Sequence, residues 1–541
     1  MLDRLKNLFR SLSIYGLGDV ATSLANLLLL PIYTRYLTTV DYGVITMLLI
    51  VEAIAKVVFR WGVDTAFMRL YYDCVDQRAR QRLASTIFFF LLAVNGTLVA
   101  ASIVSAGWLS RRIFGGSEQA LLVSLVIANT FVAGFYFLPY QVLRIKEQSR
   151  QFIALTFARS AGTLVARLVL VIWAEWGVLG VIYADVIVTA LFTLVLVRWF
   201  APLIRPVFST AIIREALGFG LPRIPHSLAH QVISVSDRYF LSWYRTLGEV
   251  GLYSIGATFG LALKLFLSAF EFAWTPFFLG VMKEKDAKEI YRTISTYVVA
   301  TLVLLGMGLC AVAPDLVTLF TAPAFHEAAE VTPWIALGVV FQGLYLVGSI
   351  GLVITKQTTR YPIATGIAAA VSLAANGLLI RGYGIMGAAW ANAIAYATLA
   401  IVTVYFSQQA YPIRYEWNRL LRIAAAGVAG YAAAHWAVPA AVNPFLGLGL
   451  HGVIAVAGYA AVLFVSGFFH AGEMRVLRDI RERVLARQPV RRTEPGRTEV
   501  EMAGEIVSAA PEPEAAAIEI DADAPVEPGP DVSPDSRAPR R

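Results

Sequence analysis

Charged residues interrupt several long apolar stretches of this sequence. Glu52, Lys56 and Arg60 recur every four residues, a spacing that places them on one face of a helix. Lys264 and Glu271 interrupt a second apolar stretch. A charge at the centre of a membrane-spanning helix costs about 2.5–3.5 kcal/mol on insertion scales. Such residues therefore predict either ion pairs that join helices or a polar cavity with a function.

Basic residues outnumber acidic ones in these stretches, which favours the cavity. Unpaired cations in a low-dielectric site attract an anion, and Arg and Lys are the usual phosphate-binding side chains. We predict a cationic cavity for an anionic headgroup, with its cations drawn from Arg35, Lys56, Arg60, Arg223, Arg238 and Lys264. The alternative is that Glu52 with Lys56, and Asp237 with a basic neighbour, only neutralise one another.

Other polar residues in the apolar stretches are candidates for lining the same cavity. They are Glu52, His226, His230, Asp237, Glu271, Asn376 and Asn392. His226 and His230 have the i, i+4 spacing of helical zinc ligands, but no glutamate completes the HExxH pattern. A cavity-lining role suits these histidines better than a metal site, and no metal centre is predicted.

The composition argues against a soluble protein. Of the 541 residues 58% are hydrophobic and 15% are charged, whereas a soluble chain usually has about 25% charged residues. The two cysteines, Cys74 and Cys310, are too few for a disulfide scaffold. We therefore expect an all-α polytopic membrane protein rather than a globular enzyme, and no nucleic-acid partner.

Stretches of about 20 mostly apolar residues are long enough to span a bilayer as helices. Fourteen are present, at residues 13–37, 42–62, 83–107, 119–143, 152–173, 178–199, 217–243, 250–280, 293–313, 330–355, 362–381, 385–407, 420–438 and 446–469. Every second connection is rich in Lys and Arg, whereas the others hold only Arg111, Arg112, Arg245 and Arg381. The positive-inside rule then predicts that both termini are cytoplasmic.

The chain also repeats itself at an offset of about 208 residues. The matching segments are 41–43 with 249–251, 146–154 with 356–364, and 176–185 with 383–392. Six helices per unit preserve orientation, so we predict two parallel six-helix repeats followed by two C-terminal helices. Lys56 and Lys264 occupy equivalent positions and are expected to face each other between the repeats.

This organisation predicts five segments along the chain. They are a cytoplasmic N-terminal segment (1–12), an N-lobe of helices one to six (13–205), a C-lobe of helices seven to twelve (206–410), helices thirteen and fourteen (411–470), and a cytoplasmic tail (471–541). From residue 488 onward the tail has 12 acidic and 6 basic residues and many prolines, a composition typical of disorder.

Motifs at three helix junctions resemble those of a known family. They are Leu30-Pro-Ile-Tyr-Thr-Arg35 followed by Asp41-Tyr-Gly43, Asp237-Arg238-Tyr-Phe-Leu followed by residues 249–254, and Asn376-Gly-Leu-Leu-Ile followed by residues 383–389. Through these motifs, residues 10–470 resemble the polysaccharide-biosynthesis flippases, the Wzx-type branch of the MOP exporter superfamily. A layout of fourteen helices is shared by that superfamily.

The resemblance implies a transporter and not an enzyme. Such flippases move undecaprenyl-pyrophosphate-linked oligosaccharides from the inner to the outer leaflet of the bacterial plasma (inner) membrane, for O-antigen, exopolysaccharide or capsule synthesis. The implied mechanism is alternating access without a cofactor, with Na⁺ or H⁺ as the candidate coupling ion. Related flippases have a sodium site in the second lobe, and Asp237, Asn376 and Asn392 are the polar residues here that are candidates for such a site. The match fails at Leu378, where those proteins have a coordinating carboxylate.

The implied partners are the lipid-linked oligosaccharide, membrane lipids, and a polysaccharide polymerase with its chain-length machinery; a monomer is expected. A lipid II flippase is the first alternative, because it predicts a similar cationic cavity. A multidrug or cation exporter would favour acidic cavity residues. A membrane polysaccharide polymerase or ligase would need a large outer loop, and the longest here covers only about residues 314–332. Replacing Lys56 or Lys264 with alanine is expected to cripple export.

Overall fold

The computed structural model describes residues 30–469 apart from residues 147, 358 and 440–441. All regular elements within this part are helices, which confirms the predicted all-α class, whereas the predicted count of fourteen spanning helices stays a prediction. The predicted N-terminal segment, most of the first predicted helix and the tail from residue 471 lie outside the described residues.

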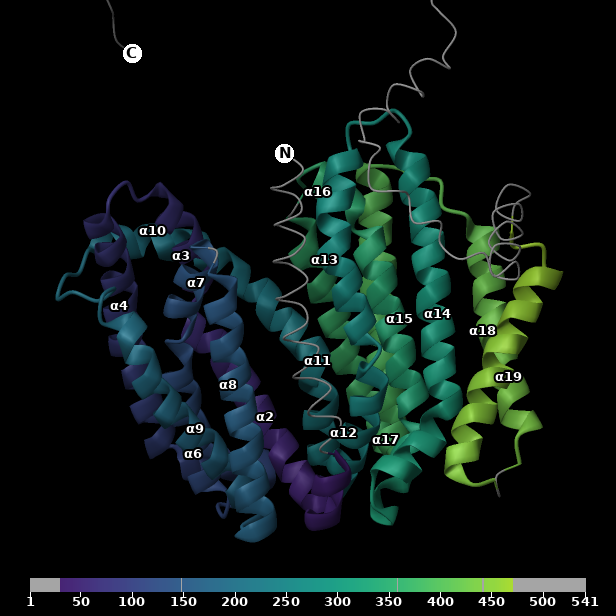
Figure 1. The fold of residues 1–541 in the computed structure, drawn as a ribbon, viewed down its shortest axis with the longest axis horizontal. Helices are drawn as coiled ribbons and strands as arrows, with labels where there is room; N and C mark the ends of the chain where they lie inside the picture. Colours follow the sequence, from purple (N-terminus) through teal and green to yellow (C-terminus); the bar gives the residue numbers. More distant parts are fainter. Residues whose placement is uncertain (1–29, 147, 358, 440–441, 470–541) are drawn as a thin grey trace, which may run out of the picture. The chain divides into compact units, whose positions relative to one another are not determined.

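The described part of the N-lobe runs through the first helices of the chain (Figure 1). They are α2 (Thr39–Arg60), α3 (Val63–Asp73), α4 (Gln77–Val104), α5 (Ala106–Phe114), α6 (Ala120–Gly134), α7 (Phe137–Ile145), α8 (Ser149–Leu168), the π-helical turn η1 (Val169–Trp173) and α9 (Gly177–Phe200). Each of the predicted helices two to six is therefore helical over almost all of its length, in one piece or in two.

The C-lobe and the last two predicted helices follow in the same way. The elements are α10 (Thr210–Gly220), η2 (Leu221–Arg223), α11 (Ile224–Tyr244), α12 (Leu247–Leu261), α13 (Lys264–Val281), α14 (Ala287–Phe320), η3 (Pro323–Glu330), α15 (Thr332–Gly348), α16 (Ile350–Ile354), α17 (Arg360–Ala410), α18 (Trp417–Ala437) and α19 (Pro444–Val465). Predicted helices eleven and twelve both lie within α17, which turns at Gly384.

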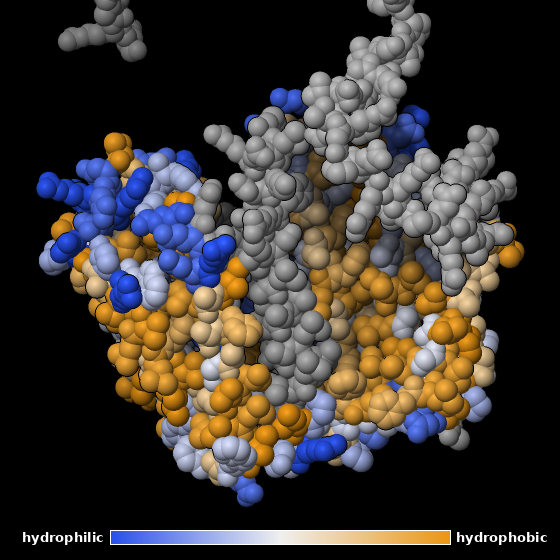
Figure 2. Space-filling model, in the orientation of Figure 1, coloured by the Kyte–Doolittle hydropathy of each residue, from blue (hydrophilic) through white to orange (hydrophobic). Residues whose placement is uncertain are grey.

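The surface and the helix lengths are those of a multi-pass membrane protein. Nine helices of the described residues are long and apolar enough to cross a membrane, or ten if the bent pair α12 and α13 forms one span. Figure 2 shows hydrophobic residues covering the middle of the long helices, with hydrophilic residues gathered towards their ends. An apolar belt of this kind is expected where side chains contact lipid rather than water.

Matching helix caps support the repeat. The hydroxyl of Thr38 accepts a hydrogen bond from the Asp41 amide, and the Asp41 carboxylate accepts one from the Thr38 amide, which forms a capping box at α2. Thr246 caps α12 in the same way by accepting from the amide of Glu249. Both cap residues and both acidic residues are 208 positions apart, so the offset found in the sequence is an offset between equivalent structural positions.

The two capped helices contact each other through their glycines. A Cβ atom added to Gly43 would overlap the backbone of Leu247, and one added to Gly251 would overlap the backbone of Thr39. The two glycines are 208 residues apart, and so are their partners Thr39 and Leu247. The contact is therefore reciprocal, like the self-complementary contact across a two-fold axis. Glycine is required here because only its hydrogen fits between the two backbones.

A second pair of glycines repeats at an offset of 207. Gly177 and Gly384 both have positive φ angles, of 53° and 54°, and both occur where one predicted span turns into the next. Three residues later, Gly180 and Gly387 each pack against carbonyl oxygens at the end of the preceding helix. Positive φ is readily available to glycine alone, so the same turn is built in both lobes from the same residue type.

Helix breaks lie where the chain passes between the lobes. Trp61 and Gly62, which both have positive φ, separate α2 from α3, and Gly62 contacts Gly220 at the end of α10. Pro222 follows in η2, where the chain continues into α11. α10 packs in one hydrophobic cluster with α3, α4 and α7, whereas α11 packs with α12 and α17 (Figure 1). The predicted helix seven is therefore divided between the lobes.

Candidate functional site

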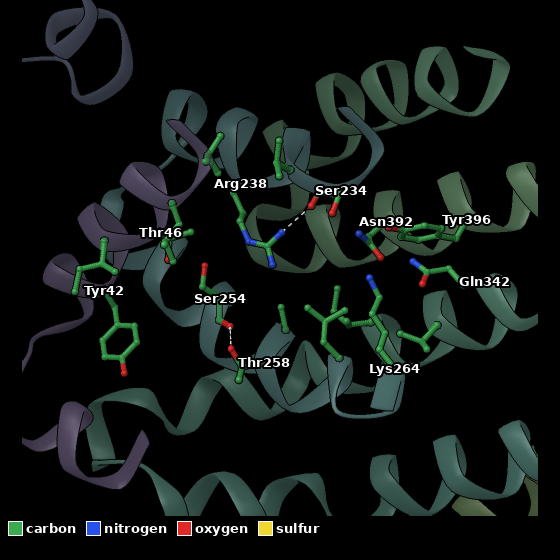
Figure 3. A pocket seen from close by; sticks show the side chains of 18 residues that line it. Tyr42, Thr46, Ser234, Arg238, Ser254, Thr258, Lys264, Gln342, Asn392 and Tyr396 are labelled. Atoms are coloured by element: carbon green, nitrogen blue, oxygen red, sulfur yellow. Dashed lines mark hydrogen bonds between the residues drawn. The ribbon is translucent and has the colours of Figure 1, made fainter. Parts of the chain in front are cut away.

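A cavity of about 320 Å³ lies between α2 of the N-lobe and five helices of the C-lobe (Figure 3). The C-lobe helices are α11, α12, α13, α15 and α17. Its apolar lining comes from Ile45, Leu49, Ile50, Val235, Ala257, Leu261, Ile335 and Val339. Its polar lining comes from Tyr42, Thr46, Ser234, Arg238, Ser254, Thr258, Lys264, Gln342, Asn392 and Tyr396. No carboxylate is among the described residues that line it.

Arg238 reaches the cavity from α11. Its Nη1 atom donates to the carbonyl oxygen of Ser234 at 3.1 Å and lies 3.2 Å from Oδ1 of Asp237. The guanidinium also lies over the ring of Tyr253, 5.2 Å from its centroid. The hydrogen bonds described for this guanidinium all use Nη1, so Nε and Nη2 remain available to a ligand in the cavity.

Asp237 lies directly behind Arg238 and is only 1% exposed. Tyr253 donates from its hydroxyl to Oδ2 at 2.5 Å, and Asn392 donates from Nδ2 to the same oxygen at 3.2 Å. Together with Arg238, two neutral donors therefore satisfy one buried carboxylate, as the cost of burying a charge requires. This cluster fixes α11 to α12 and α17 and holds the Arg238 side chain at the cavity.

Lys264 is the first residue of α13 and enters the cavity from the side opposite Arg238 (Figure 3). Its ammonium lies 5.9 Å from the centroid of the Tyr396 ring, at cation–π distance. Among the described residues, no carboxylate lies within 4.0 Å of this ammonium. Among the residues that the structure describes, the cavity therefore contains two cations, and the carboxylate of Asp237 lies close behind its wall.

Lys56 and Arg60 lie elsewhere. Lys56 continues the face of α2 that carries Leu49, but two turns beyond it, and it is not among the cavity residues. Its ammonium forms an ion pair with Glu52 at 2.5 Å, and Arg60 pairs with Asp64 at 3.4 Å. Lys56 and Lys264 therefore do not meet in this cavity, and on α2 the alternative of neutralising pairs describes the geometry.

The remaining predicted residues occupy several positions around the C-lobe. Asn376 donates from Nδ2 to the hydroxyl of Ser236, the residue before Asp237. The Oδ1 atom of Asn376 is buried without a hydrogen-bond partner among the described residues. His226 contacts Thr365 at 3.1 Å. Arg35, His230 and Glu271 are not among the residues that line the cavity, and Arg35 and Glu271 are exposed. Arg223 is the last residue of η2.

Several polar residues of the cavity were not predicted from the sequence. Gln342 is the only amide side chain in the apolar stretch at 330–355, which is a signal that was present. Ser254 and Thr258 have i, i+4 spacing on α12, but hydroxyls are common in membrane helices and do not mark a site by themselves. Tyr396 resembles many other aromatic residues of the chain and gave no signal.

Comparisons with known proteins identify the family of the chain. The profile of the family described as polysaccharide biosynthesis protein matches residues 8–282. "Lsg locus putative protein 1" of Haemophilus influenzae is 22% identical over 295 residues, which are 51% of this chain and 67% of that protein.

Solved structures share the fold at low sequence identity. The lipid II flippase MurJ in an inward closed conformation superposes with a TM-score of 0.65 at 15% identity, over 90% of this chain and all of that one. An inward-facing MATE multidrug resistance transporter of the MOP superfamily gives 0.55 at 15% identity, over 75% of this chain and 96% of that one. The chain therefore belongs to the polysaccharide biosynthesis protein family and is a multi-pass membrane protein with the fold of MOP-superfamily transporters.

Proposed function

We propose that this protein is a flippase that moves undecaprenyl-pyrophosphate-linked oligosaccharide units from the inner to the outer leaflet by alternating access. The observation that carries the proposal is the pair Arg238 and Lys264 in one cavity whose described lining has no carboxylate. A pyrophosphate supplies the missing negative charge, and a guanidinium binds phosphate oxygens through two parallel hydrogen bonds.

The remaining lining suits the sugar end of such a substrate. Hydroxyl and amide side chains, such as Ser254, Thr258 and Gln342, donate to and accept from sugar hydroxyls. The volume of about 320 Å³ is at the lower end of the range for small-molecule sites. In this conformation the cavity therefore accommodates the pyrophosphate and adjoining sugar, and the rest of the oligosaccharide requires a wider state.

The proposal includes a place in the cell. The charge bias of the connections supports a plasma (inner) membrane protein with both termini in the cytoplasm. We propose that it acts as a monomer and delivers its cargo to a polysaccharide polymerase and the chain-length machinery. Asp237, with Asn376 and Asn392, is the proposed site of coupling to Na⁺ or H⁺, because its carboxylate pairs with the cavity cation Arg238 and accepts a hydrogen bond from Asn392.

Replacing Lys264 with alanine tests the proposal. A hydrogen bond to a charged group is worth about 1.5–3 kcal/mol, which corresponds to roughly a 10- to 150-fold loss of transport. The measurement is surface polysaccharide produced by a strain that lacks its own flippase and carries the variant, normalised to the amount of variant in the membrane. Lys264→Arg keeps the charge and should retain most of the export. Full export by Lys264→Ala would disprove the assignment of this cavity.

A lipid II flippase is the second candidate, because the structure superposes on all of such a protein. Both substrates carry a pyrophosphate, so the cavity cations do not distinguish them. Rescue of a strain depleted of its lipid II flippase would favour this candidate. Rescue of a strain lacking only an oligosaccharide flippase would favour the first.

A further inference from the structure

A second cavity, of about 170 Å³, lies within the N-lobe. It is enclosed by the end of α3, the start of α4, the ends of α7 and α9, and the segments that follow them. Figure 2 shows hydrophilic residues gathered over this end of the N-lobe. These connections follow helices two, four and six, so they belong to the set that the charge bias places in the cytoplasm.

The charged lining of this cavity is entirely basic. Arg80, Lys146 and Arg198 line it, and its described lining contains no acidic residue. None of the three has an ion-pair partner among the described residues, and Nε of Arg80 is buried without a hydrogen bond there. The nearby Asp76 uses Oδ1 to cap α4, accepting from the amide of Ala79 at 2.7 Å.

Aromatic rings hold two of these cations in place. The Arg80 guanidinium lies 5.1 Å from the ring centroid of Tyr71, and that of Arg198 lies 6.0 Å from the ring of Trp199. Gln81 joins the two sides of the cavity, since its Nε2 donates to the carbonyl oxygen of Pro202 at 2.8 Å. The site is therefore built from several elements and does not depend on one flexible side chain.

Two further amide side chains, Gln77 and Gln148, line the cavity, and the rest of the lining is apolar. The apolar part lies at the end of the spanning helices and consists of Pro139, Val142, Leu143, Pro202 and Leu203. A free phosphate would need only the cations, whereas a lipid headgroup also places its glycerol and first acyl carbons against a wall of this kind. Anionic lipids give the membrane surface a net negative charge, and basic pockets between spanning helices bind their headgroups.

We propose that this cavity binds the headgroup of an anionic phospholipid from the adjacent leaflet. The site is separate from the cavity that contains Arg238 and Lys264, and the proposal does not depend on what that cavity transports. An ordered lipid here would bridge α4, α7 and α9 where their ends bring three positive charges together, and would relieve the repulsion between those charges.

The test uses the purified full-length chain and native mass spectrometry of its complexes with added phosphatidylglycerol or phosphatidylethanolamine. The tightest-bound phosphatidylglycerol should bind the wild type more strongly than phosphatidylethanolamine does. Each of Lys146→Gln and Arg198→Gln should weaken it about fivefold, and the two together about 25-fold. Arg112→Gln is the matched control, because Arg112 also lies over a tryptophan, Trp108 at 5.7 Å, but on α5 and outside this cavity.

Three results would overturn the proposal. One is an unchanged phosphatidylglycerol affinity in the double variant, and another is an equal loss in Arg112→Gln. The third is displacement of the lipid by inorganic pyrophosphate at micromolar concentration, which would mean that the site takes a soluble phosphate compound. Lys146 and Arg198 are both exposed, so their replacement should not unfold the N-lobe. Size-exclusion profiles identical to that of the wild type serve as the check.

Discussion

The two lobes share a backbone plan but treat their membrane charges differently. In the N-lobe, Glu52 pairs with Lys56, Arg60 with Asp64, and Arg167 with Asp185. In the C-lobe Lys264 faces a cavity with no carboxylate within ion-pair distance among the described residues. The repeat therefore preserves caps and turns, while the two cations that line the cavity between α2 and the C-lobe helices both come from the C-lobe.

Equivalent positions show how the difference arises. Asp185 binds Arg167 through two hydrogen bonds, of 2.9 and 2.7 Å. Its counterpart 207 residues later is Asn392, which is neutral and donates to Asp237 instead. The same position thus holds a carboxylate that pairs with Arg167 in the N-lobe and an amide that donates a hydrogen bond to Asp237 in the C-lobe. Symmetry of the backbone does not imply symmetry of function.

The largest expected effect is that of Asp237→Ala. Arg238 would lose its ion-pair partner, and Tyr253 and Asn392 would lose their acceptor. Breaking a buried pair by removing one partner costs about 3–5 kcal/mol. We expect a clear fall in the midpoint of thermal unfolding of the purified protein and loss of export. Asp237→Asn, which keeps an acceptor oxygen, should lose less stability, and an Asp237→Ala protein as stable as the wild type would contradict this account of the cluster.

The next effect concerns the N-lobe pair. Arg167→Gln leaves Asp185 without its partner, and we expect a loss of roughly 2–3 kcal/mol, less than for Asp237 because the pair is about one-fifth exposed. Combining it with Asp185→Asn should recover most of this stability and near-normal export, since two amides can still bond. Thermal unfolding and polysaccharide export measure the two properties. A double variant that folds but does not export would show that the N-lobe charges also serve transport.

The smallest expected effect is that of Lys56→Gln. The Lys56 side chain is about half exposed and already paired with Glu52, and exposed pairs contribute about 0–1 kcal/mol. We expect less than a twofold change in export, against the large loss for Lys264→Ala. Parallel export assays at equal membrane levels compare them directly. Equal loss in both variants would restore the symmetric arrangement expected from the sequence.

Helix positions could be predicted because a spanning helix must be about 20 apolar residues long whatever its neighbours are. Breaks within the helices were harder to predict. Pro222 lies at a break, as expected for proline, but Pro276 lies inside α13. The 43° bend in that span instead falls between α12 and α13, at Ala262 and Leu263. Neither residue is a proline or glycine, so the sequence does not predict a bend there.

The candidate site was only partly accessible from sequence for a related reason. Arg238, Lys264 and Asn392 were found because a polar side chain in an apolar stretch is conspicuous. Which of the cations share a cavity depends on how far α2 runs beside the C-lobe, and Lys56 lies two turns beyond that contact. Sequence periodicity gives the face of a helix but not the length over which that face is covered.

The glycine contact between α2 and α12 has a consequence for how the halves can diverge. A side chain at Gly43 or Gly251 would meet backbone atoms of the other half, and backbone, unlike a side chain, has no alternative rotamer. The contact therefore constrains both halves at once: a substitution at either glycine requires a shift of the backbone in the other half. The charged residues nearby are under no such shared constraint and differ between the halves.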